Sequence, residues 1–504
     1  MASIVQTELT LPAAMRMQQL VQDYVRGLTR LAGLPEDQRE SLSLAFWEAC
    51  RNAVEHAFDA ENPGTLKLSG TLTPTTLVLS LGDQGLPFYQ MQGVRDATPD
   101  PASPAPVCRG MASVSSCFDE VHWSYHGVEG NELRLTKNLT GVCGPPPPEA
   151  EAAGDRLEPA EPAAPETYTV RLLRPGEGLR VAQLIYRVYG YTYPHKDFYY
   201  PDRLDHDLAT GRLVGVVAVA GDGEFAAHLG MTRWDLGPLG SVGAFMVAPA
   251  HRGRGLTKLL GQRLQAEIQT LGLVGLFGEA VTIHTISQQI AVGLGYRVTG
   301  LKLSDLELHF NRLPRRDGPS SSWEREADPG LQRQTLVFIF HYLAPPAPKT
   351  LFPPPRHREM LTKIYGNLEV ETKFLDPTLP TGPGEIKIHF DQVSGVGTIQ
   401  VNRIGSDTRP KIIQARRDLC DLAGAQVVGL CLPLGQGGAP HLCEAAEADG
   451  FFFSGVLPQF APDGDFLRLQ YLNIGLEPES IHLYSPFAKE LLTYILREKE
   501  RVGP

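Results

Sequence analysis

Cysteine is scarce in this sequence, and its cysteines are scattered. Seven occur in 504 residues, an odd number, and none forms a C-x-x-C pair. A disulfide framework needs paired cysteines and a zinc knuckle needs closely spaced ones, so the pattern favours neither and indicates reduced thiols. No apolar run reaches the ~18–20 residues that span a bilayer. The N-terminal MASIVQTELTL also lacks the basic-then-apolar layout of a signal peptide. We therefore expect a cytoplasmic protein with no membrane partner.

An excess of positive charge is absent too. The chain has 46 lysines and arginines against 57 acidic residues, a net charge of −11. Nucleic acids and anionic membranes are polyanions, so this balance disfavours both as general partners, although one basic loop can still bind one phosphate group. The hydrophobic content of 42% is that of a core-forming chain. A chain of this length predicts about three domains.

The domain boundaries follow from composition. Residues 144–166 read GPPPPEAEAAGDRLEPAEPAAPE, with Leu157 as the single large apolar residue. Such a segment cannot bury enough surface to fold, and its prolines keep it extended. A second stretch rich in proline, serine and charge lies near residues 312–328. These segments predict an α/β multidomain protein with domains over residues 1–141, 167–315 and 330–504 and a linker over residues 142–166.

The first domain contains a helix with a polar stripe. In AFWEACRNAVEHAF (residues 45–58), Glu48, Asn52 and His56 recur every four residues beside an apolar stripe. Further on, TLKLSGTLTPTTLVLSLGDQG (residues 65–85) predicts two antiparallel strands that end at Asp83. A helix followed by a hairpin indicates an α/β sandwich.

Four motifs of this domain occur in the order of the GHKL ATPase fold. Glu48-x-x-x-Asn52 resembles its N-box, and Asp83-x-Gly85 resembles its adenine-binding G1 box. CRGM (residues 108–111) resembles the G2 box, although Cys108 stands where the family has glycine, and NELRLTK (residues 131–137) resembles the closing strand. The order and spacing are most similar to the anti-sigma-factor serine kinases.

This resemblance implies an ATP site with Mg²⁺. Asn52 would hold Mg²⁺ while Glu48 acts catalytically by orienting or deprotonating the attacking hydroxyl. Asp83 would accept the adenine amino group, Gly85 would leave room for the base, and the amides at Gly110 would meet phosphate oxygens. The implied ATP-binding residues are Asn52, Asp83, Gly85, Arg109, Gly110, Met111 and Lys137. The implied partners are an anti-sigma antagonist or sigma-factor-like protein and a second copy in a homodimer. The alternative interpretation is a solvated polar stripe, and His56 is assigned only to the helix surface.

The second domain contains a strand, a basic glycine-rich turn and a helix. SVGAFMVAPAHRGRGLTKLLGQRLQAEIQTLG (residues 241–272) predicts a strand that breaks at Pro249 and a helix with leucines 256, 259, 260 and 264 on one side. The turn resembles motif A of the GNAT superfamily of N-acetyltransferases, R/Q-x-x-G-x-G/A, with Thr257 in the third position. Small residues there let backbone amides point at the pyrophosphate of coenzyme A, and backbone groups at Val247 would bind the pantetheine arm.

A second GNAT-like motif follows in LVGLFGEAVTIHTISQQIAVGLGY (residues 273–296). It resembles motif B, with His284 at the usual asparagine. Ala291 stands where the family often has a tyrosine that protonates the departing thiolate, so another group or water would have to do so. The implied acetyl-CoA-binding residues are Met246, Val247, Arg252, Gly253, Arg254, Gly255, Leu256, Thr257, His284 and Ser287.

Acyl transfer to an amine also needs a base and an acceptor pocket. Tyr193 and His195 lie in a tyrosine-rich segment, residues 189–195, where the family has an acceptor-binding loop. Glu279 is the third catalytic candidate, because it lies in an otherwise apolar strand where burial favours the protonated carboxyl. The alternatives are an aromatic-packed loop for the segment and a structural carboxylate paired with an arginine for Glu279.

The last third gives weaker signals. Its order of hairpin, helix, buried strand, helix and strand pair resembles the back half of a GNAT domain, without an Arg-x-x-Gly-x-Gly turn. We interpret it as a degenerate GNAT-like α/β domain that shapes the acceptor site of the second domain; an unrelated α/β domain is the alternative.

The sequence as a whole predicts an acyl-CoA-dependent N-acetyltransferase fused to an ATP-binding, serine-kinase-like regulatory domain. The acyl acceptor would be an amine on a small molecule or a protein. One alternative is a non-catalytic signalling adaptor that senses ATP and acyl-CoA and acts by binding a partner. Another is an acyltransferase whose GHKL-like domain only adjusts its activity to the adenine-nucleotide level.

Overall fold

The computed structural model describes residues 4–58, 64–87, 114–139, 167–233, 237–307 and 333–503. The expected linker and the G2-box residues Arg109, Gly110 and Met111 lie outside these ranges. None of the helices in the described ranges has the length and apolar character needed to cross a bilayer.

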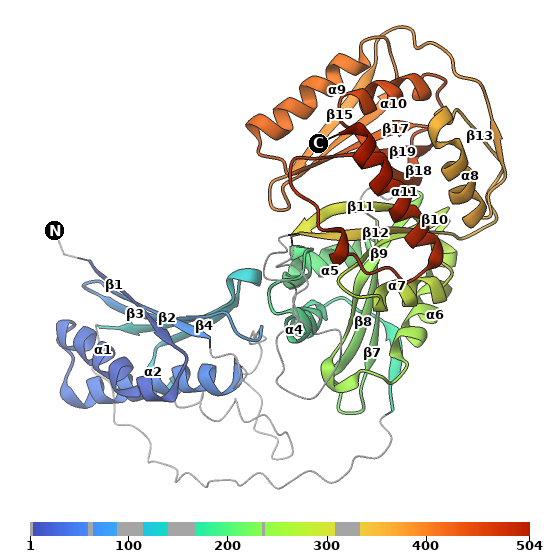
Figure 1. Cartoon of the computed structure of the whole chain (residues 1–504). Helices are drawn as coiled ribbons and strands as arrows, with labels where there is room; N and C mark the ends of the chain where they lie inside the picture. The colour runs from blue at the N-terminus through green and yellow to red at the C-terminus, as the bar shows by residue number, and fades with distance from the viewer. Residues whose placement is uncertain are drawn as a thin grey trace.

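The N-terminal domain is a two-layer α/β sandwich, as predicted (Figure 1). Its antiparallel sheet has the order β1-β2-β3-β5-β4, and two helices pack on one face of it. The strands are β1 (Val5–Pro12), β2 (Thr65–Leu72), β3 (Thr76–Asp83), β4 (Glu120–Tyr125) and β5 (Asn131–Asn138). The helices are α1 (Gln18–Leu31) and α2 (Glu36–His56). α2 begins directly after Pro35 with two acidic residues in its first turn, which the helix dipole favours.

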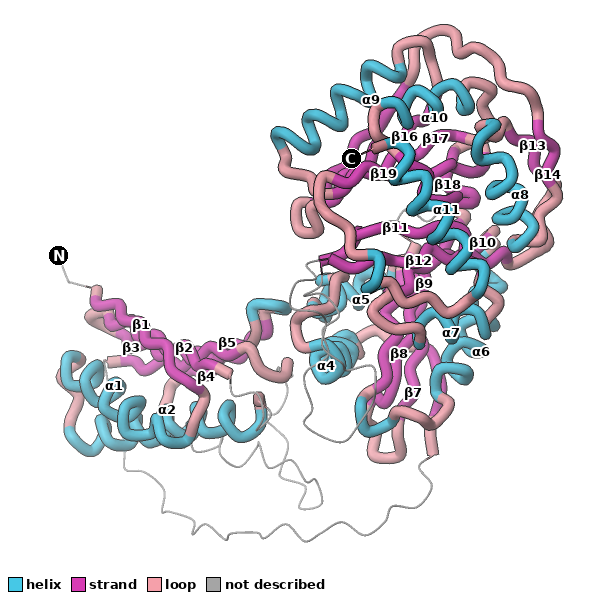
Figure 2. The backbone as a smooth tube through the Cα atoms, in the orientation of Figure 1, coloured by secondary structure: helices cyan, strands magenta, loops and turns pink. Residues whose placement is uncertain are grey.

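The remaining described strands, apart from one short pair, form a 12-stranded sheet built from two halves (Figure 2). The first half has the order β6-β7-β8-β9-β10-β12-β11, and only β9 and β10 run parallel. Its strands are β6 (Thr169–Leu172), β7 (Leu213–Val219), β8 (Phe225–Thr232), β9 (Leu239–Val247), β10 (Gly275–Val281), β11 (Arg297–Glu307) and β12 (Arg333–Tyr342). Its helices are α4 (Gly178–Tyr189), α5 (Pro201–Ala209), α6 (Leu256–Ile268) and α7 (Ile286–Gly293).

The position of strand β12 differs from the expected boundary between the second and third domains at residues 315–330. The sequence analysis placed residues 333–342 in the third domain, but β12 lies between β10 and β11 and is antiparallel to both. The strand is buried along residues 333–340, and its place between β10 and β11 pairs both of its edges. The first half is therefore completed by a strand from beyond the expected boundary.

The second half repeats the strand pattern of the first. The order β15-β16-β17-β19-β18 is antiparallel, parallel, antiparallel and antiparallel, which is also the pattern of β8-β9-β10-β12-β11. Its strands are β15 (Glu385–Asp391), β16 (Val396–Arg403), β17 (Val427–Pro433), β18 (Phe452–Ala461) and β19 (Gly464–Leu472). Its helices are α8 (Arg358–Asn367), α9 (Thr408–Arg417), α10 (Ala439–Ala448) and α11 (Pro486–Val502), and β13 (Lys349–Leu351) pairs with β14 (Thr372–Phe374). The second half is thus a mixed α/β unit with the same core strand topology as the first.

The two halves join where β11 meets β18. Gly300 pairs with Gly455, and a Cβ on Gly455 would lie 2.3 Å from the Cα of Gly300, so the backbones meet at a distance that only glycine allows. Beside this pair, the side chain of Gln470 accepts the Leu303 N–H at 3.0 Å and donates to the Leu303 carbonyl at 2.6 Å. Buried side chains of both halves belong to one continuous core.

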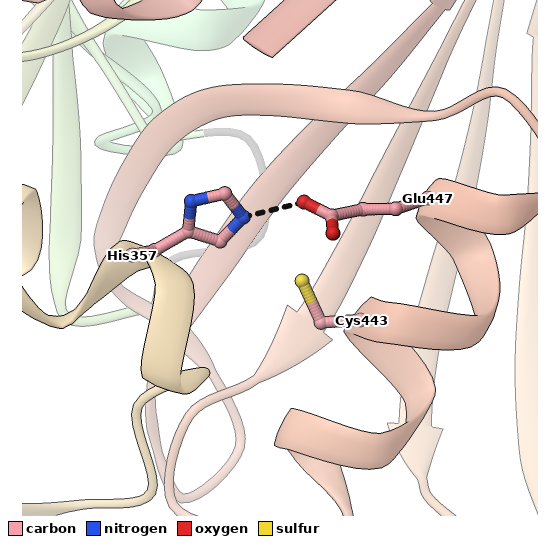
Figure 3. A group of neighbouring side chains, drawn as sticks. All are labelled: His357, Cys443 and Glu447. Carbon is pink, nitrogen blue, oxygen red and sulfur yellow. Dashed lines mark hydrogen bonds and ion pairs between the residues drawn. The ribbon is translucent and has the colours of Figure 1, made fainter. Parts of the chain in front are cut away.

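A buried polar cluster connects His357, directly before α8, with Glu447 of α10 and Arg501 of α11 in the second half. Figure 3 shows its His357, Cys443 and Glu447 side chains. His357, Cys443 and Glu447 place possible metal-ligand atoms within 4.8 Å of one another. However, Glu447 Oε1 is 2.7 Å from His357 Nε2 and 2.7 Å from Arg501 Nη2. Burial favours the protonated form of Glu447, but the hydrogen bond with His357 and the charge of Arg501 outweigh it and lower the pKa of Glu447. The positive charge beside Glu447 is thus the guanidinium of Arg501, and the cluster connects α10 and α11 with the start of α8.

Candidate functional site

Asp83, the expected adenine acceptor, ends β3 and is buried. Its Oδ1 accepts the Gly85 N–H at 2.8 Å and the Asn131 side-chain N–H at 2.9 Å. Burial raises the pKa of Asp83, and the two hydrogen bonds oppose that shift. Gly85 is required for space, because a Cβ there would lie 2.4 Å from the carbonyl oxygen of Ala57 at the end of α2. The turn is therefore fixed against α2, and it presents a carboxylate held in a set orientation.

Asn52 lies one turn after Glu48 on α2. Its amide nitrogen is buried and has no hydrogen-bond partner among the residues that the structure describes. A buried N–H donor without an acceptor is costly, which fits a position whose partner is a phosphate oxygen or water; Mg²⁺ would instead bind the amide oxygen of Asn52. Glu48 Oε2 is 2.6 Å from Arg51 Nη2, an ion pair that the sequence analysis missed. His56 is exposed on the helix surface.

Lys137 is not brought to this turn. On β5 it pairs with Leu77, whereas Asn131 pairs with Asp83 at the other end of the strand. Six residues of strand correspond to ~20 Å. Lys137 instead forms an ion pair with Asp119 at 3.2 Å. Of the expected ATP-binding set, the described residues near the turn are Asp83 and Gly85, with Asn52 on the adjoining helix.

In the second domain, β9 and β10 separate along their length. They pair only from Leu239–Gly275 to Ser241–Phe277. A bulge follows in β9, where Ala244 has a φ of 49° and the register with β8 shifts. Ala248 donates its N–H to the carbonyl of Ala226 in β8 at 2.9 Å, so strand alternation turns the N–H and carbonyl of Val247 toward the β10 side. The neighbouring Met246 is buried and pairs with β8.

The turn before α6 is open. Gly253 and Gly255 have φ values of 76° and 73°, and a Cβ on either would meet no atom within 4 Å. No side chain caps α6, whose first residues are the buried Leu256 and the half-buried Thr257. The first amides of a helix have no intrahelical acceptor, so this end can receive an anion.

The arginines of this turn have separate contacts. Arg252 Nε lies 3.5 Å from the Val247 carbonyl, and Arg254 donates to the Tyr168 hydroxyl at 2.7 Å. The leucines that follow on α6 were expected to lie on one side of an amphipathic helix. Leu256, Leu260 and Leu264 are buried, but Leu259 is 44% exposed.

The corresponding turn of the second half is closed. After β16, Thr408 Oγ1 accepts the Gly405 N–H at 2.7 Å, and Ser406 donates its N–H to Gly382 at 3.0 Å. Asp407 accepts the Gly384 N–H at 2.6 Å, and a Cβ on Gly405 would lie 2.2 Å from that nitrogen. Residues 382–384 therefore occupy the space next to this turn, whereas the space next to Gly255 in the first half is open.

The expected motif B residues lie where β10 passes into α7. The Ser287 hydroxyl oxygen is buried and finds no hydrogen-bond partner in the described ranges. Burial lowers the pKa of His284. Gln288 donates to the His482 carbonyl at 2.9 Å and accepts the Tyr484 N–H at 3.0 Å. The chain before α11 therefore holds α7 in place.

The three catalytic candidates of this domain lie near the separated strands. The Tyr193 hydroxyl accepts the Ala244 N–H at 2.8 Å, and its ring centroid is 5.8 Å from that of His195. Burial raises the pKa of Tyr193, so it stays protonated and is unsuited to be a base. The surrounding protein lowers the pKa of His195 although solvent reaches its side chain, and the carboxylates of Glu279 and Asp197 oppose that shift.

Glu279 differs from expectation. It is exposed and forms an ion pair with Lys302 from β11, so it is neither buried nor paired with an arginine. Its side chain leaves β10 on the face away from the core residues Leu276 and Ala280, because side chains alternate along a strand.

His228 on β8 is a residue that the sequence analysis missed. It is fully buried, and its Nδ1–H donates to the Ala244 carbonyl at 2.8 Å, so His228 and Tyr193 hold the two backbone groups of the bulge residue. Its Nε2 has no partner within the described chain. A lone titratable residue in the apolar strand FAAHLGMT was the signal that could have drawn attention to it.

The buried His228 predicts an acid-sensitive fold. Burial lowers the pKa of His228 to about 4 from the ordinary 6.5. Because the unfolded chain takes up this proton first, the stability from neutral His228 is complete above pH ~6.5 and falls by roughly 3 kcal/mol as the pH drops to ~4. In His228→Asn the amide can still donate to Ala244 but cannot titrate. The free energy of unfolding, measured by urea denaturation, should fall less between pH 7 and pH 4 in this variant than in the parent protein. If it falls equally in both proteins, buried neutral His228 is not the cause of the acid sensitivity.

The chain joins two classes of domain. Residues 11–137 match the family model of the histidine kinase-like ATPase domain, and residues 179–288 match that of the acetyltransferase (GNAT) family. The first part is 31% identical over 141 residues to serine-protein kinase RsbW from Bacillus velezensis, covering 27% of this chain and 86% of that protein. RsbW from Bacillus subtilis is 26% identical over the same length, again 86% of that protein. Through this part, the chain belongs to the RsbW family of histidine kinase-like ATPases.

Solved structures of acetyltransferases cover about a third of this chain at low similarity. The ribosomal-protein-S18-alanine N-acetyltransferase from Escherichia coli aligns at 13% identity and a TM-score of 0.26, covering 35% of this chain and 95% of that one. The spermidine/spermine N-acetyltransferase SpeG from Vibrio cholerae aligns at 12% identity and a TM-score of 0.26, covering 35% and 92%.

Proposed function

We propose that the first half of the large sheet is an acyl-CoA-dependent N-acyltransferase. One observation carries this: the open, uncapped start of α6 lies directly after the strand end at which Val247 turns its backbone groups toward the separated β10. The amides of residues 253–257 suit a pyrophosphate, and Val247 suits an amide-rich arm. The orphaned Ser287 hydroxyl offers one more hydrogen bond to the same ligand.

The chain's own residues suit the acceptor side of the reaction. A bound acyl thioester supplies an activated carbonyl carbon. The acceptor amine must lose a proton, and His195, kept neutral by its surroundings, and the accessible Glu279 can take it. Tyr193 is a positioning residue, since its hydroxyl holds Ala244. Because this hydroxyl accepts the Ala244 N–H, its own proton remains available to the departing thiolate. Ala291, at the motif B position where the family often has a tyrosine, has no proton to donate.

We further propose that residues 333–342 and the second half belong to this acyltransferase. Lys302, which pairs with Glu279, also lies 3.6 Å from Asp305, and Asp305 is 3.4 Å from Arg468 of β19. This chain of charges leads from the base candidate into the second half. The second half would then orient the acceptor side while binding no coenzyme A of its own, because its equivalent turn is closed.

For the N-terminal domain we propose adenine-nucleotide binding with Mg²⁺. Asp83 would accept the adenine amino group, and Asn52 would face the phosphates or Mg²⁺. The support is the fixed Asp83 carboxylate and the orphaned Asn52 amide. We also propose that this domain transfers phosphate to a protein partner. For Glu48 to act on the attacking hydroxyl, its ion pair with Arg51 must first break.

The test is acyl transfer itself. Purified protein is mixed with acetyl-CoA and a panel of polyamines, amino acids and lysine peptides, and free thiol is measured. We expect thiol release that depends on the amine and falls at least about tenfold in Glu279→Gln. If no amine stimulates release while acetyl-CoA still binds, the acyltransferase proposal fails.

A second candidate is the non-catalytic signalling adaptor. It is favoured by the Glu48–Arg51 ion pair and by Ala291, since both remove a catalytic group from its expected position. An adaptor would bind both ligands but would release neither thiol from acetyl-CoA nor labelled phosphate from ATP in the presence of partner proteins.

A further inference from the structure

The adenine-side turn of the N-terminal domain is in contact with the acetyltransferase domain. The Tyr191 hydroxyl donates to the Gly85 carbonyl at 3.0 Å, and Gln183 of α4 donates to the Pro87 carbonyl at 2.9 Å. A third, longer contact joins the Tyr186 hydroxyl to the Gln84 carbonyl at 3.4 Å. Three successive contacts thus reach the backbone of one short turn.

Packing supports the same contact on the neighbouring loop between β4 and β5. Gly127 has a φ of 64°, and a Cβ there would lie 2.3 Å from the ring of Tyr200. Val128 packs against the apolar cluster that α4 and α5 form in the acetyltransferase domain. Polar and apolar contacts therefore dock the same edge of the N-terminal domain.

The segment that makes this contact also reaches the bulge of β9. Two residues after Tyr191, the Tyr193 hydroxyl accepts the Ala244 N–H at 2.8 Å. The segment between them is held by Tyr199, whose hydroxyl donates to the Gly190 carbonyl at 2.7 Å and accepts the Tyr193 N–H at 3.1 Å. The Tyr191 and Tyr199 rings also pack with centroids 5.2 Å apart. A short, internally braced segment therefore connects the Asp83–Gly85 turn with the strand that leads to Val247.

We propose that this segment, residues 189–199, couples the two ligand sites, so that adenine nucleotide in the N-terminal domain tightens acyl-CoA binding in the acetyltransferase domain. The inference rests on the proposed function, and it adds regulation of that site. The physical reason is preorganisation: Tyr191 fixes the turn on which Asp83 and Gly85 lie, and Tyr193 fixes the bulge before Val247. A nucleotide that binds the docked turn better than the free one stabilises docking, and docking then favours the bulge geometry that coenzyme A uses.

The test measures binding rather than turnover. Calorimetry on the full chain gives the Kd of coenzyme A with and without saturating Mg²⁺ and a non-hydrolysable ATP analogue. We expect the analogue to tighten coenzyme A binding about fivefold or more, and coenzyme A to tighten analogue binding by the same factor, because linkage is reciprocal.

Matched variants locate the coupling. In Tyr191→Phe, which removes only the hydroxyl that bonds Gly85, both ligands should still bind, but the mutual effect should fall below about twofold. Tyr186→Phe removes the longer 3.4 Å contact and should keep most of the effect. Independent binding in the parent protein, or full coupling in Tyr191→Phe, would overturn this inference alone. If coenzyme A does not bind even without nucleotide, the proposed function fails and this inference fails with it.

Discussion

Gly255→Glu is expected to weaken coenzyme A binding by ~hundredfold or more. The new carboxylate would occupy the open space at the start of α6, where the proposed function places a pyrophosphate. Two like charges ~4 Å apart near a protein surface repel by about 4 kcal/mol, which outweighs the 1–2 kcal/mol that a side chain costs at a positive φ. Calorimetry with coenzyme A measures the loss.

The chain offers a matched control for this variant. Gly272 also has a positive φ, 64°, and open space around its Cβ, but it lies at the opposite end of the α6 segment, after Ile268 and a short 3-10 turn. Gly272→Glu therefore adds the same charge with the same backbone strain away from the turn, and it should leave coenzyme A affinity within about twofold, given ordinary screening of a distant charge. Equal affinities in the two variants would show that the α6 turn does not bind the pyrophosphate.

The helices, strands and turns that form the two proposed ligand sites were predictable because their signals are local. Pro35 with two acidic residues marks the start of α2, and the glycines at 253 and 255 mark a turn that needs positive φ. Alternating apolar residues fix the hairpin that ends at Asp83. Each signal lies within a few residues of the structure that it determines, so reading the chain in order is enough to find it.

What could not be predicted depends on contacts far apart in the sequence. Strand β12 has no local feature that places it between β10 and β11. Tyr191 reads as one tyrosine among several, and only the folded chain brings it to Gly85, 106 positions away. The exposure of Glu279 likewise follows from which face of β10 the core occupies. Tertiary packing decides these features, and a single sequence does not reveal it.

These distant contacts change how the domains can work together. A proline-rich linker by itself would let the N-terminal domain move independently of the rest. The docking of Gly127 against Tyr200 and of the Asp83–Gly85 turn against α4 removes that independence in the described state. Nucleotide affinity measured on the isolated N-terminal domain is therefore expected to differ from that of the full chain.

Asn52→Ala should weaken Mg²⁺–ATP binding at least about tenfold, in line with the loss of a metal-site residue. The buried Nδ2 of Asn52 has no hydrogen-bond partner among the described residues, so the substitution breaks no hydrogen bond of that atom, and the loss should appear mainly in ligand affinity. Coenzyme A affinity without nucleotide should be unchanged. Calorimetry with the non-hydrolysable analogue and Mg²⁺ measures the effect, and omitting Mg²⁺ should narrow the difference between variant and parent if Asn52 acts through the metal.

His56→Ala is the control for Asn52→Ala, because His56 lies one turn further along the same stripe of α2 but is exposed. If the stripe is merely a solvated helix face, both variants should bind nucleotide as the parent does. If Asn52 faces the nucleotide, only Asn52→Ala loses affinity. The two outcomes therefore distinguish a polar stripe that is only helix surface from one that binds a ligand. α2 presents Asn52 and His56 on the same side, but of these two only Asn52 has a buried polar atom without a hydrogen-bond partner among the described residues.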